Sequence, residues 1–260
     1  MLDTVALPML LGAAIVVPSP RAPTLFTTLK IAGIAVPILD CLAIGWFLLA
    51  FGGYQSLSRW PAMERRSIAG AVQRQRIEWM RNMARRDNRM MDSVLIQQLG
   101  QGNAFFASTS AIGIGGLAAL IGSGEKLKAV LEQLPFVGRV EPSMLEMKLL
   151  LLIAIFVYAF FKFAWAFRLS HYTGIMIGAT PVPGAVNAAA CERHALGVAS
   201  LIGIAADHAN SGLRSFYYAF AAMSWFFHPV LFLIATTWVL AILIRRDFYS
   251  RSLKTLSGQP

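Results

Sequence analysis

Charged residues are scarce in this sequence of 260 residues, and their scarcity argues against a water-soluble domain. Asp, Glu, Lys and Arg make up 14% of the chain, whereas hydrophobic residues make up 57%. A soluble domain has about a quarter charged residues and about half apolar residues. Both departures predict an all-α integral membrane protein.

The signatures of common catalytic sites are also missing. The two cysteines, Cys41 and Cys191, lie far apart, so they indicate neither a disulfide framework nor a zinc-binding spacing. The sequence contains no phosphate-binding glycine loop, nucleophile elbow, deaminase motif or metalloprotease motif. Cys191 lies near Glu192, His194 and His208, but this spacing matches no standard metal site. We therefore expect no catalytic residues, no metal ion and no cofactor, and we expect a protein that is not an enzyme.

Four apolar segments are long enough to cross a bilayer as helices, because the hydrocarbon core requires about 20 apolar residues. The predicted spans are residues 37–57, 103–122, 149–167 and 216–244. Pro229 lies inside the last span, and its missing backbone N–H predicts a kink near Trp225 to His228. We expect His228 to be a packed or hydrogen-bonding residue rather than a haem ligand or a proton carrier.

Asp40 in the first span allows two interpretations. If the helix begins near Lys30, the carboxylate lies in the middle of the membrane and is a candidate functional group. If Pro37 instead takes the first helical position, Asp40 lies in the first turn, beside the positive end of the helix dipole. We favour the second interpretation.

Small residues recur every four positions in the second span and form a stripe along one side of the predicted helix. Such a stripe lets another helix approach closely in lipid. The helix-packing stripe consists of Ala107, Ala111, Gly115 and Ala119.

The segment between the first two spans predicts one long amphipathic helix. Apolar residues recur on one face from Ile68 to Val94, and arginines lie opposite. These arginines are Arg74, Arg81, Arg85 and Arg89. We expect a cytoplasmic or interfacial helix of about 40 Å, which Gly100 and Gly102 separate from the second span. It either lies on the membrane among anionic headgroups or packs against a partner helix or a second copy.

Basic residues give conflicting indications of orientation. The segment between the first two spans contains nine arginines, which predicts a cytoplasmic location. Four spans then place both chain ends outside, yet the C-terminal tail carries the basic run "RRDFYSRSLK". A fifth span near residues 185–206 removes the conflict, but Glu192 and Arg193 lie inside that segment.

A polar cluster is predicted where the spans meet the cytoplasmic side. Asp92 precedes the second span, Arg168 ends the third and Arg214 begins the fourth. Because charges taken partly out of water need partners, we expect Asp92 to pair with Arg168 or Arg214. The alternative is that these groups only face headgroups and water. The whole predicted cluster is Asn88, Arg89, Asp92, Arg168, Arg214 and Tyr217.

The chain divides into a proline-rich extension (residues 1–36), a single membrane domain (residues 37–251) and a tail (residues 252–260). The extension lacks the positive n-region of a signal peptide and carries Asp3 instead. We therefore do not interpret it as a cleaved signal.

Several stretches between Leu39 and Arg251 together resemble a known family. They are "RRDNRMMD", "FFAST", "GGLAALIGSGE", "FVYAFFKFAWAFR", "IGATP" and "RSFYYAFAAMSWFFHP". They resemble the bacterial branch of the integral membrane family catalogued as domain of unknown function 599. The resemblance implies four membrane helices, and we expect a location in the bacterial inner membrane. It brings no established activity, cofactor or catalytic residue.

Two functions of different classes are consistent with these features. The first is a non-enzymatic scaffold or accessory component that binds other membrane helices. Its expected partners are anionic headgroups and a second copy or another membrane protein, and no nucleic acid. The alternative is a small oligomeric transporter or channel, which usually needs ionisable groups facing a cavity. We favour the scaffold, because every charge in the spans can be placed near an interface.

Overall fold

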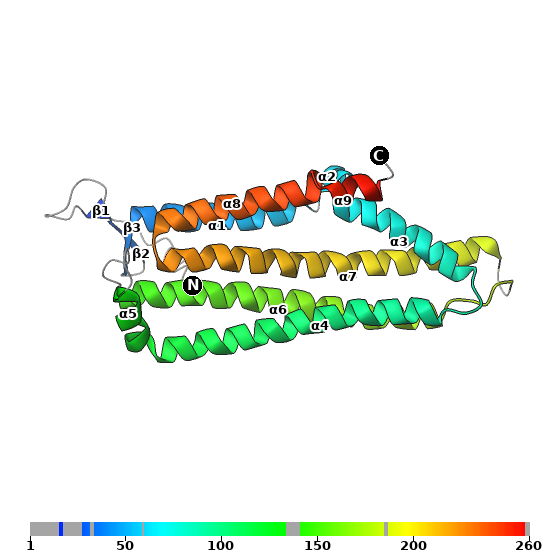
Figure 1. Cartoon of the computed structure of the whole chain (residues 1–260), viewed down its shortest axis with the longest axis horizontal. Helices are drawn as coiled ribbons and strands as arrows, with labels where there is room; N and C mark the ends of the chain where they lie inside the picture. Colours follow the sequence, from blue (N-terminus) through cyan, green and yellow to red (C-terminus); the bar gives the residue numbers. More distant parts are fainter. Residues whose placement is uncertain are drawn as a thin grey trace, which may run out of the picture.

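The computed structural model describes residues 16–17, 28–31, 34–58, 60–133, 141–184 and 187–257. Long helices run side by side and form an elongated bundle (Figure 1). Short strands precede the bundle and pair antiparallel in the order β1-β2-β3. They are β1 (Val16–Val17), β2 (Thr28–Ile31) and β3 (Ile34–Pro37). The rest of the predicted N-terminal extension lies outside the described residues.

Four helices of the described chain are long and apolar enough to cross a membrane. They are α1 (Ile38–Leu57), α4 (Met90–Gly122), α6 (Pro142–Gly178) and α8 (Pro229–Phe248). The first three contain the predicted spans 37–57, 103–122 and 149–167 almost completely. Because α1 begins directly after Pro37, Asp40 lies in its first turn, which confirms the favoured interpretation of this residue.

A fourth apolar helix is present, but the predicted bounds of the fourth span, residues 216–244, are wrong, because the chain reverses direction inside this segment. Its first residues end α7 (Ala188–Met223), and the short 3-10 helix η1 (Ser224–Phe226) leads into α8. Helix α8 then runs back along α7 (Figure 1). Pro229 therefore starts a helix and does not kink one, since a first helical residue needs no N–H partner.

His228 is the N-cap residue of α8. Its backbone is extended (φ −160°, ψ 141°), the conformation favoured before proline. Its Nδ1 accepts a hydrogen bond of 3.2 Å from the backbone N–H of Val230. The expected hydrogen-bonding role of His228 is thus confirmed in the form of an N-cap.

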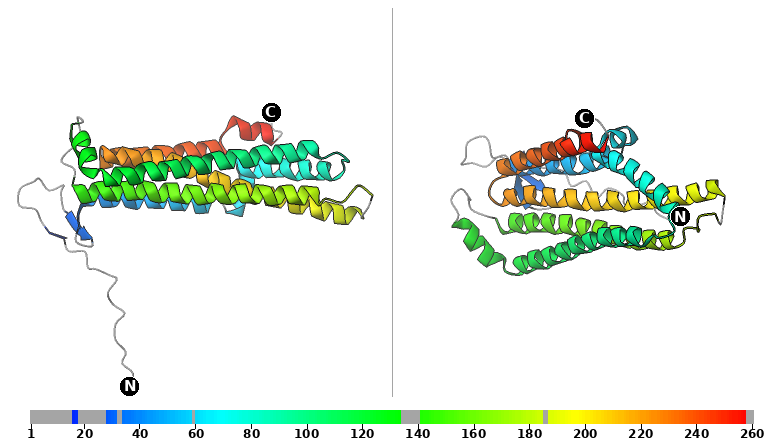
Figure 2. Two further views of the ribbon diagram at one scale, coloured as in Figure 1. Left: turned by 90° about the horizontal axis from the view of Figure 1, so that it is seen from below. Right: turned by 45° about the vertical axis from the view of Figure 1, so that its right-hand side comes forward.

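Helix α7 is a further long element beside the four apolar helices, packed against α6 and α8 (Figure 1). It extends well beyond the segment 185–206 that the sequence offered as a fifth span. Because α7 runs the length of the bundle, α8 then returns towards the arginine-rich segment (Figure 1). Figure 2 shows α9 (Arg251–Leu256, red) on the side of the bundle, directly after α8, and it contacts α3 (Ile68–Ala84) there. The two basic segments therefore lie together.

The predicted amphipathic helix is divided in the structure. After α2 (Pro61–Arg66), α3 ends at Ala84, and α4 begins at Met90. The apolar side of α3 packs against the described residues of α7 rather than facing away from the protein. The buried residues of this contact include Met80, Met83, Ala195, Val198, Ala199 and Ile202.

Gly100 and Gly102 do not interrupt α4, contrary to the prediction. The helix continues through both residues, and Gly100 is a point of close approach to α6. A Cβ atom at Gly100 would lie 3.3 Å from the Cβ of Ser170. The glycine therefore allows close packing of two helices and does not end one.

The long helices differ in length, which divides the bundle into two parts. Helices α1 and α8 have 20 residues each, or about 30 Å, the thickness of a bilayer core. Helices α4, α6 and α7 have 33, 37 and 36 residues, or about 50–55 Å. They extend past the end of α1, where α3 packs on them. At the opposite end, α5 (Gly124–Glu132) follows α4 (Figure 1).

The core of the shorter part contains aromatic, aliphatic and small side chains from α1, α6, α7, η1 and α8. Phe47 is buried and contacts Tyr218 edge-on, with ring centroids 5.7 Å apart. It also contacts Phe232 at 5.1 Å, which in turn stacks on Trp225 at 5.3 Å. This aromatic core fixes α1, α7 and α8 relative to one another.

Candidate functional site

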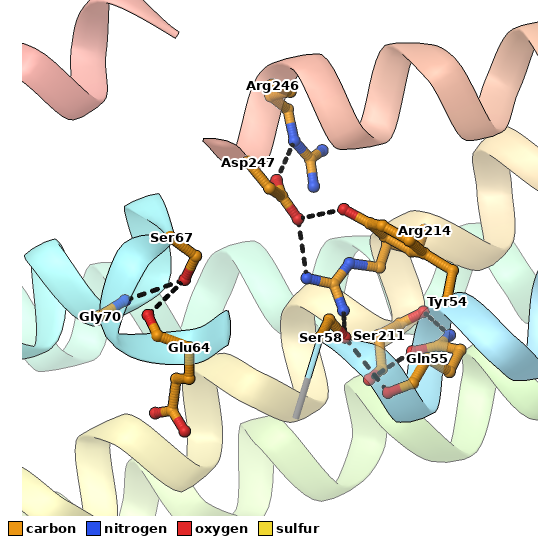
Figure 3. Close-up of polar contacts among 10 residues, drawn as sticks. All are labelled: Tyr54, Gln55, Ser58, Glu64, Ser67, Gly70, Ser211, Arg214, Arg246 and Asp247. Carbon is orange, nitrogen blue, oxygen red and sulfur yellow. Dashed lines mark hydrogen bonds and ion pairs between the residues drawn. The ribbon is translucent and has the colours of Figure 1, made fainter. Parts of the chain in front are cut away.

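Buried polar side chains connect α1, α7 and α8 at the end of α1 (Figure 3). The Asp247 carboxylate lies at their centre. Its Oδ2 accepts hydrogen bonds from the Tyr54 hydroxyl at 2.7 Å and from Arg214 Nη2 at 3.0 Å. Its Oδ1 accepts from Arg246 Nε at 2.9 Å. We call these residues, together with Ser58, the Arg214 network.

Arg214 is held on several sides. Its Nη1 donates to the Ser58 hydroxyl at 2.5 Å, and its guanidinium lies 5.1 Å from the centroid of the Tyr54 ring. Arg214 and Asp247 are both buried. A buried charge needs a partner with good geometry, and Asp247 provides it. With two guanidinium groups and one carboxylate, the network carries a net charge of one positive unit.

Gln55 and Ser211 form a second link beside the Arg214 network (Figure 3). Gln55 Nε2 donates to the Ser211 carbonyl at 3.3 Å, and the Ser211 hydroxyl donates to Gln55 Oε1 at 3.1 Å. The network and this link tie the end of α1 to the middle of α7. Apart from the buried Arg214 Nε, which has no hydrogen-bond partner among the described residues, their donors and acceptors point at one another. The arrangement therefore suits a clamp between helices better than proton transfer.

Asp92 does not join Arg168 or Arg214, so the predicted pairing is wrong. Its Oδ1 accepts from Trp79 Nε1 at 2.7 Å and from Arg86 Nη1 at 3.2 Å. Arg168 donates to the Tyr172 hydroxyl at 3.0 Å. The structure therefore divides the predicted cluster into separate groups.

The physical reason is distance along the bundle. Asp92 precedes Gly100 by eight residues of α4, and Gly100 lies beside Ser170. Arg214 lies at nearly the same height in the bundle as Phe163, because a Cβ atom on the nearby Gly212 would lie 2.7 Å from the Phe163 ring. With 1.5 Å per helical residue, Asp92 and Arg214 are separated by roughly 20 Å. The fold-back of α3 instead brings Trp79 and Arg86 to Asp92.

The remaining members of the predicted cluster have local roles. Arg89 donates to the carbonyl oxygens of Thr180 and Pro181 at 2.5 and 2.7 Å, just after α6 ends. Asn88 Oδ1 accepts from the backbone N–H of Met90 at 2.9 Å, at the start of α4. The third member, Tyr217, lies beside the Arg214 network, with its ring centroid 5.7 Å from the Arg246 guanidinium.

Arg89→Ala is expected to loosen the connection between α6 and α7. The two carbonyl groups lose a charged donor, and hydrogen bonds to charged groups are worth about 1.5–3 kcal/mol. Limited proteolysis should cut the variant faster than the unchanged protein between residues 179 and 187. The matched control is Arg85→Ala, an exposed arginine of the same segment. Equal cleavage rates for both variants would contradict the capping role.

The cysteine, histidine and acidic residues of α7 do not converge on one point. Cys191 Sγ lies 3.9 Å from the Ala84 carbonyl oxygen, and His194 Nε2 lies 2.9 Å from that of Met176. Glu192 accepts from Arg81 Nε at 2.7 Å. Among the described residues, no group of three His, Cys, Asp or Glu side chains could hold a metal ion.

Arg81 forms ion pairs on the arginine-rich side of α3. It bonds to Glu192 of α7 and to Glu78 of its own helix, at 2.7 and 2.6 Å. These hydrogen bonds, first that with Glu192, raise the pKa of the Arg81 guanidinium. The arginine thus attaches α3 to α7 from the solvent side.

The sequence did not identify Asp247 as a site residue. It lies in the run "RRD" at the end of α8, where the two arginines suggest only a basic flank. A carboxylate between basic residues at the end of an apolar helix is the signal that could have found it. The sequence also gave no indication that Trp225 is a polar partner. Its Nε1 donates to the Asp40 carboxylate at 2.7 Å, near the other end of the bundle.

Residues 42–252 match the model of a protein family described as "Protein of unknown function, DUF599". No curated protein and no solved structure matches the chain. The match covers almost the same segment as the resemblance seen in the sequence.

Proposed function

The chain belongs to the DUF599 family, and we propose that it is a non-enzymatic membrane component that binds other membrane helices through α4. The supporting observation is that the stripe predicted on this helix faces away from the rest of the chain. Ala111, Gly115 and Ala119 are all exposed, and Ala107 is half-buried. A Cβ atom at Gly115 would meet nothing within 4 Å.

The side of α4 that packs within the chain is a different one. Ser110 is buried, and a Cβ atom at Gly113 would lie 3.3 Å from the Phe156 ring. Only 11% of the most apolar stretch of α4 is buried within the chain, whereas 33% of the corresponding stretch is buried in α1 and in α6. Since small residues favour close helix contacts in lipid, the exposed stripe suits a membrane helix from outside the chain. In purified protein, α4 of a second copy is the available partner.

Gly115→Leu is expected to weaken self-association of the purified protein by roughly tenfold, because a bulky side chain holds the helices apart. A tenfold change corresponds to about 1.4 kcal/mol of association free energy. Energy transfer between labelled copies, titrated with mild detergent, measures the effect. Gly116→Leu is the matched control, since Gly116 is exposed on the same helix but lies off the stripe.

Both variants should keep the stability of the unchanged monomer, because neither glycine has a neighbour within 4 Å. If Gly115→Leu and Gly116→Leu associate as strongly as the unchanged protein, the stripe does not bind a second copy. A monomer that does not associate at any detergent ratio would exclude the homo-oligomer.

The proposal also includes an orientation, with the arginine-rich end in the cytoplasm. Basic segments remain on that side during insertion, and the two basic segments lie together, where α9 contacts α3. Arg65, Arg66 and Arg74 are exposed there. Basic residues near anionic headgroups contribute about 1 kcal/mol each. An inner membrane with anionic lipids is the location that suits this surface.

The alternative, a small oligomeric transporter or channel, finds its support in the buried charges between α1, α7 and α8. Ionisable groups inside a membrane bundle often mark a transport path. In this protein, however, Arg214 and Asp247 are bonded to each other and to Tyr54 and Ser58. These hydrogen bonds hold the charges against one another and favour the scaffold.

A further inference from the structure

A cavity of about 130 Å³ lies among α3, α4, α6 and α7, in the part of the bundle that extends past α1. Its polar lining residues are Arg76, Asn103, Ser170, Thr173 and Asn210. Isoleucines and alanines form much of the remaining wall. Leu99 also lines it and is 51% exposed, so the cavity reaches the surface of the protein beside α4.

The cavity is large enough for a compact chemical group. An engineered cavity of about 150 Å³ binds benzene and stays dry because its walls are entirely apolar. A cavity with polar walls instead holds water or a polar ligand. The lining of this cavity therefore selects for a ligand with hydrogen-bonding atoms.

Arg76 gives the cavity its charge. Burial lowers the pKa of its guanidinium, and the attraction of Asp207 acts in the opposite direction. An arginine nevertheless remains protonated in proteins. One of its nitrogens, Nη1, donates to Gln73 Oε1 at 3.2 Å. A guanidinium has five N–H donors in a planar fork that matches the oxygens of a phosphate.

The other polar groups favour the same ligand. Within the described part of the chain, the carboxamides of Asn103 and Asn210 have no hydrogen-bond partner, so their N–H groups are available. The hydroxyl groups of Ser170 and Thr173 already donate to carbonyl oxygens of their own helix, at 3.0 and 2.9 Å. The available donors thus belong to Arg76 and the two asparagines, which line the same cavity, and these donors suit a group rich in acceptors.

The position of the cavity indicates where such a group comes from. Asn103 begins the apolar stretch of α4, and Ser170 follows Arg168, the end of the apolar stretch of α6. Both places correspond to the boundary between hydrocarbon and headgroups. A phospholipid presents its phosphate at this level.

We propose that this cavity binds the phosphate group of an anionic phospholipid, with Arg76 as the main contact and Asn103 and Asn210 as supporting donors. The acyl chains leave the protein past Leu99 along the surface of α4. Asn103 precedes Ala107 of the stripe by about one helical turn, whereas Arg76 and Asn210 belong to α3 and α7. The Arg76 variant below therefore tests the lipid site without changing the stripe.

The test uses the full-length protein in mild detergent, incubated with phosphatidylglycerol and measured by native mass spectrometry. Arg76→Gln is expected to weaken lipid binding by about tenfold or more, because a charge-assisted pair of hydrogen bonds is lost. Arg74→Gln is the matched control: it removes an exposed arginine from the same helix and should retain the lipid. Asn103→Asp leaves Arg76 unchanged and should also expel the lipid by repulsion.

Competition with excess inorganic phosphate identifies the source of the ligand. If phosphate leaves the bound lipid in place, the lipid headgroup is the ligand. If phosphate binds alone in an Arg76-dependent manner while the lipid does not, the lipid assignment is overturned. Equal lipid retention by Arg76→Gln, Asn103→Asp and Arg74→Gln would overturn the site itself.

Discussion

Asp247→Asn is expected to lower the free energy of unfolding by about 3–5 kcal/mol, the usual cost of removing one partner from a buried ion pair. The substitution keeps the size of the side chain and removes its charge. The buried Arg214 guanidinium then has no carboxylate, although Ser58 still accepts one of its hydrogen bonds. Thermal unfolding in mild detergent measures the loss.

The double variant Arg214→Met with Asp247→Leu separates the cost of an unpaired charge from the value of the pair. Replacing both members of a buried pair with apolar residues is often nearly neutral, so the double variant should recover much of the lost stability. Part of the loss should remain, because the Tyr54 hydroxyl no longer has its acceptor. If Asp247→Asn is as stable as the unchanged protein, the Arg214 network does not hold the bundle together.

Gly212→Ala is expected to destabilise the protein by about 1–3 kcal/mol, the range for overpacking a core. A Cβ atom at Gly212 would lie 2.7 Å from two carbons of the Phe163 ring, which is buried between α6 and α7. The ring cannot move away without disturbing its stack on Phe106, 5.1 Å between centroids. Unfolding in mild detergent again provides the measurement.

Gly116→Ala is the control, and we expect this substitution to stabilise the protein rather than destabilise it. No atom lies within 4 Å of the added methyl group, and alanine is favoured over glycine in a helix interior by about 0.5–1 kcal/mol. A second variant, Gly212→Ala with Phe163→Leu, should recover stability by making room. Equal effects at Gly212 and Gly116 would show that α6 and α7 do not approach as closely as described.

Three of the four apolar helices could be predicted from the sequence because length and hydropathy define them locally. The start of α1 at Pro37 and the position of Asp40 were also readable, since proline and a first-turn carboxylate are local signals. The reversal between α7 and α8 could not be predicted, because apolar residues continue through the turn at Ser224 to His228. Hydropathy alone cannot distinguish a bend in a long helix from a turn between two.

The polar contacts were harder to predict for a different reason. Asp92 and Arg214 carry opposite charges near the ends of predicted spans, but which carboxylate meets which arginine depends on the fold. The fold-back of α3 supplies Arg86 to Asp92, and the return of α8 supplies Asp247 to Arg214. The same fold-back carries Arg76 to the cavity. These partners become neighbours only in the folded bundle.

The late position of Asp247 has a consequence for biosynthesis. Arg214 leaves the ribosome before its counter-ion, which follows 33 residues later. Until that residue has been made, α7 carries a cation that the earlier helices do not neutralise. We therefore expect α7 and α8 to enter the bundle together as a hairpin. A nascent chain that ends before Asp247 should remain incompletely assembled and become a substrate for membrane quality-control proteases.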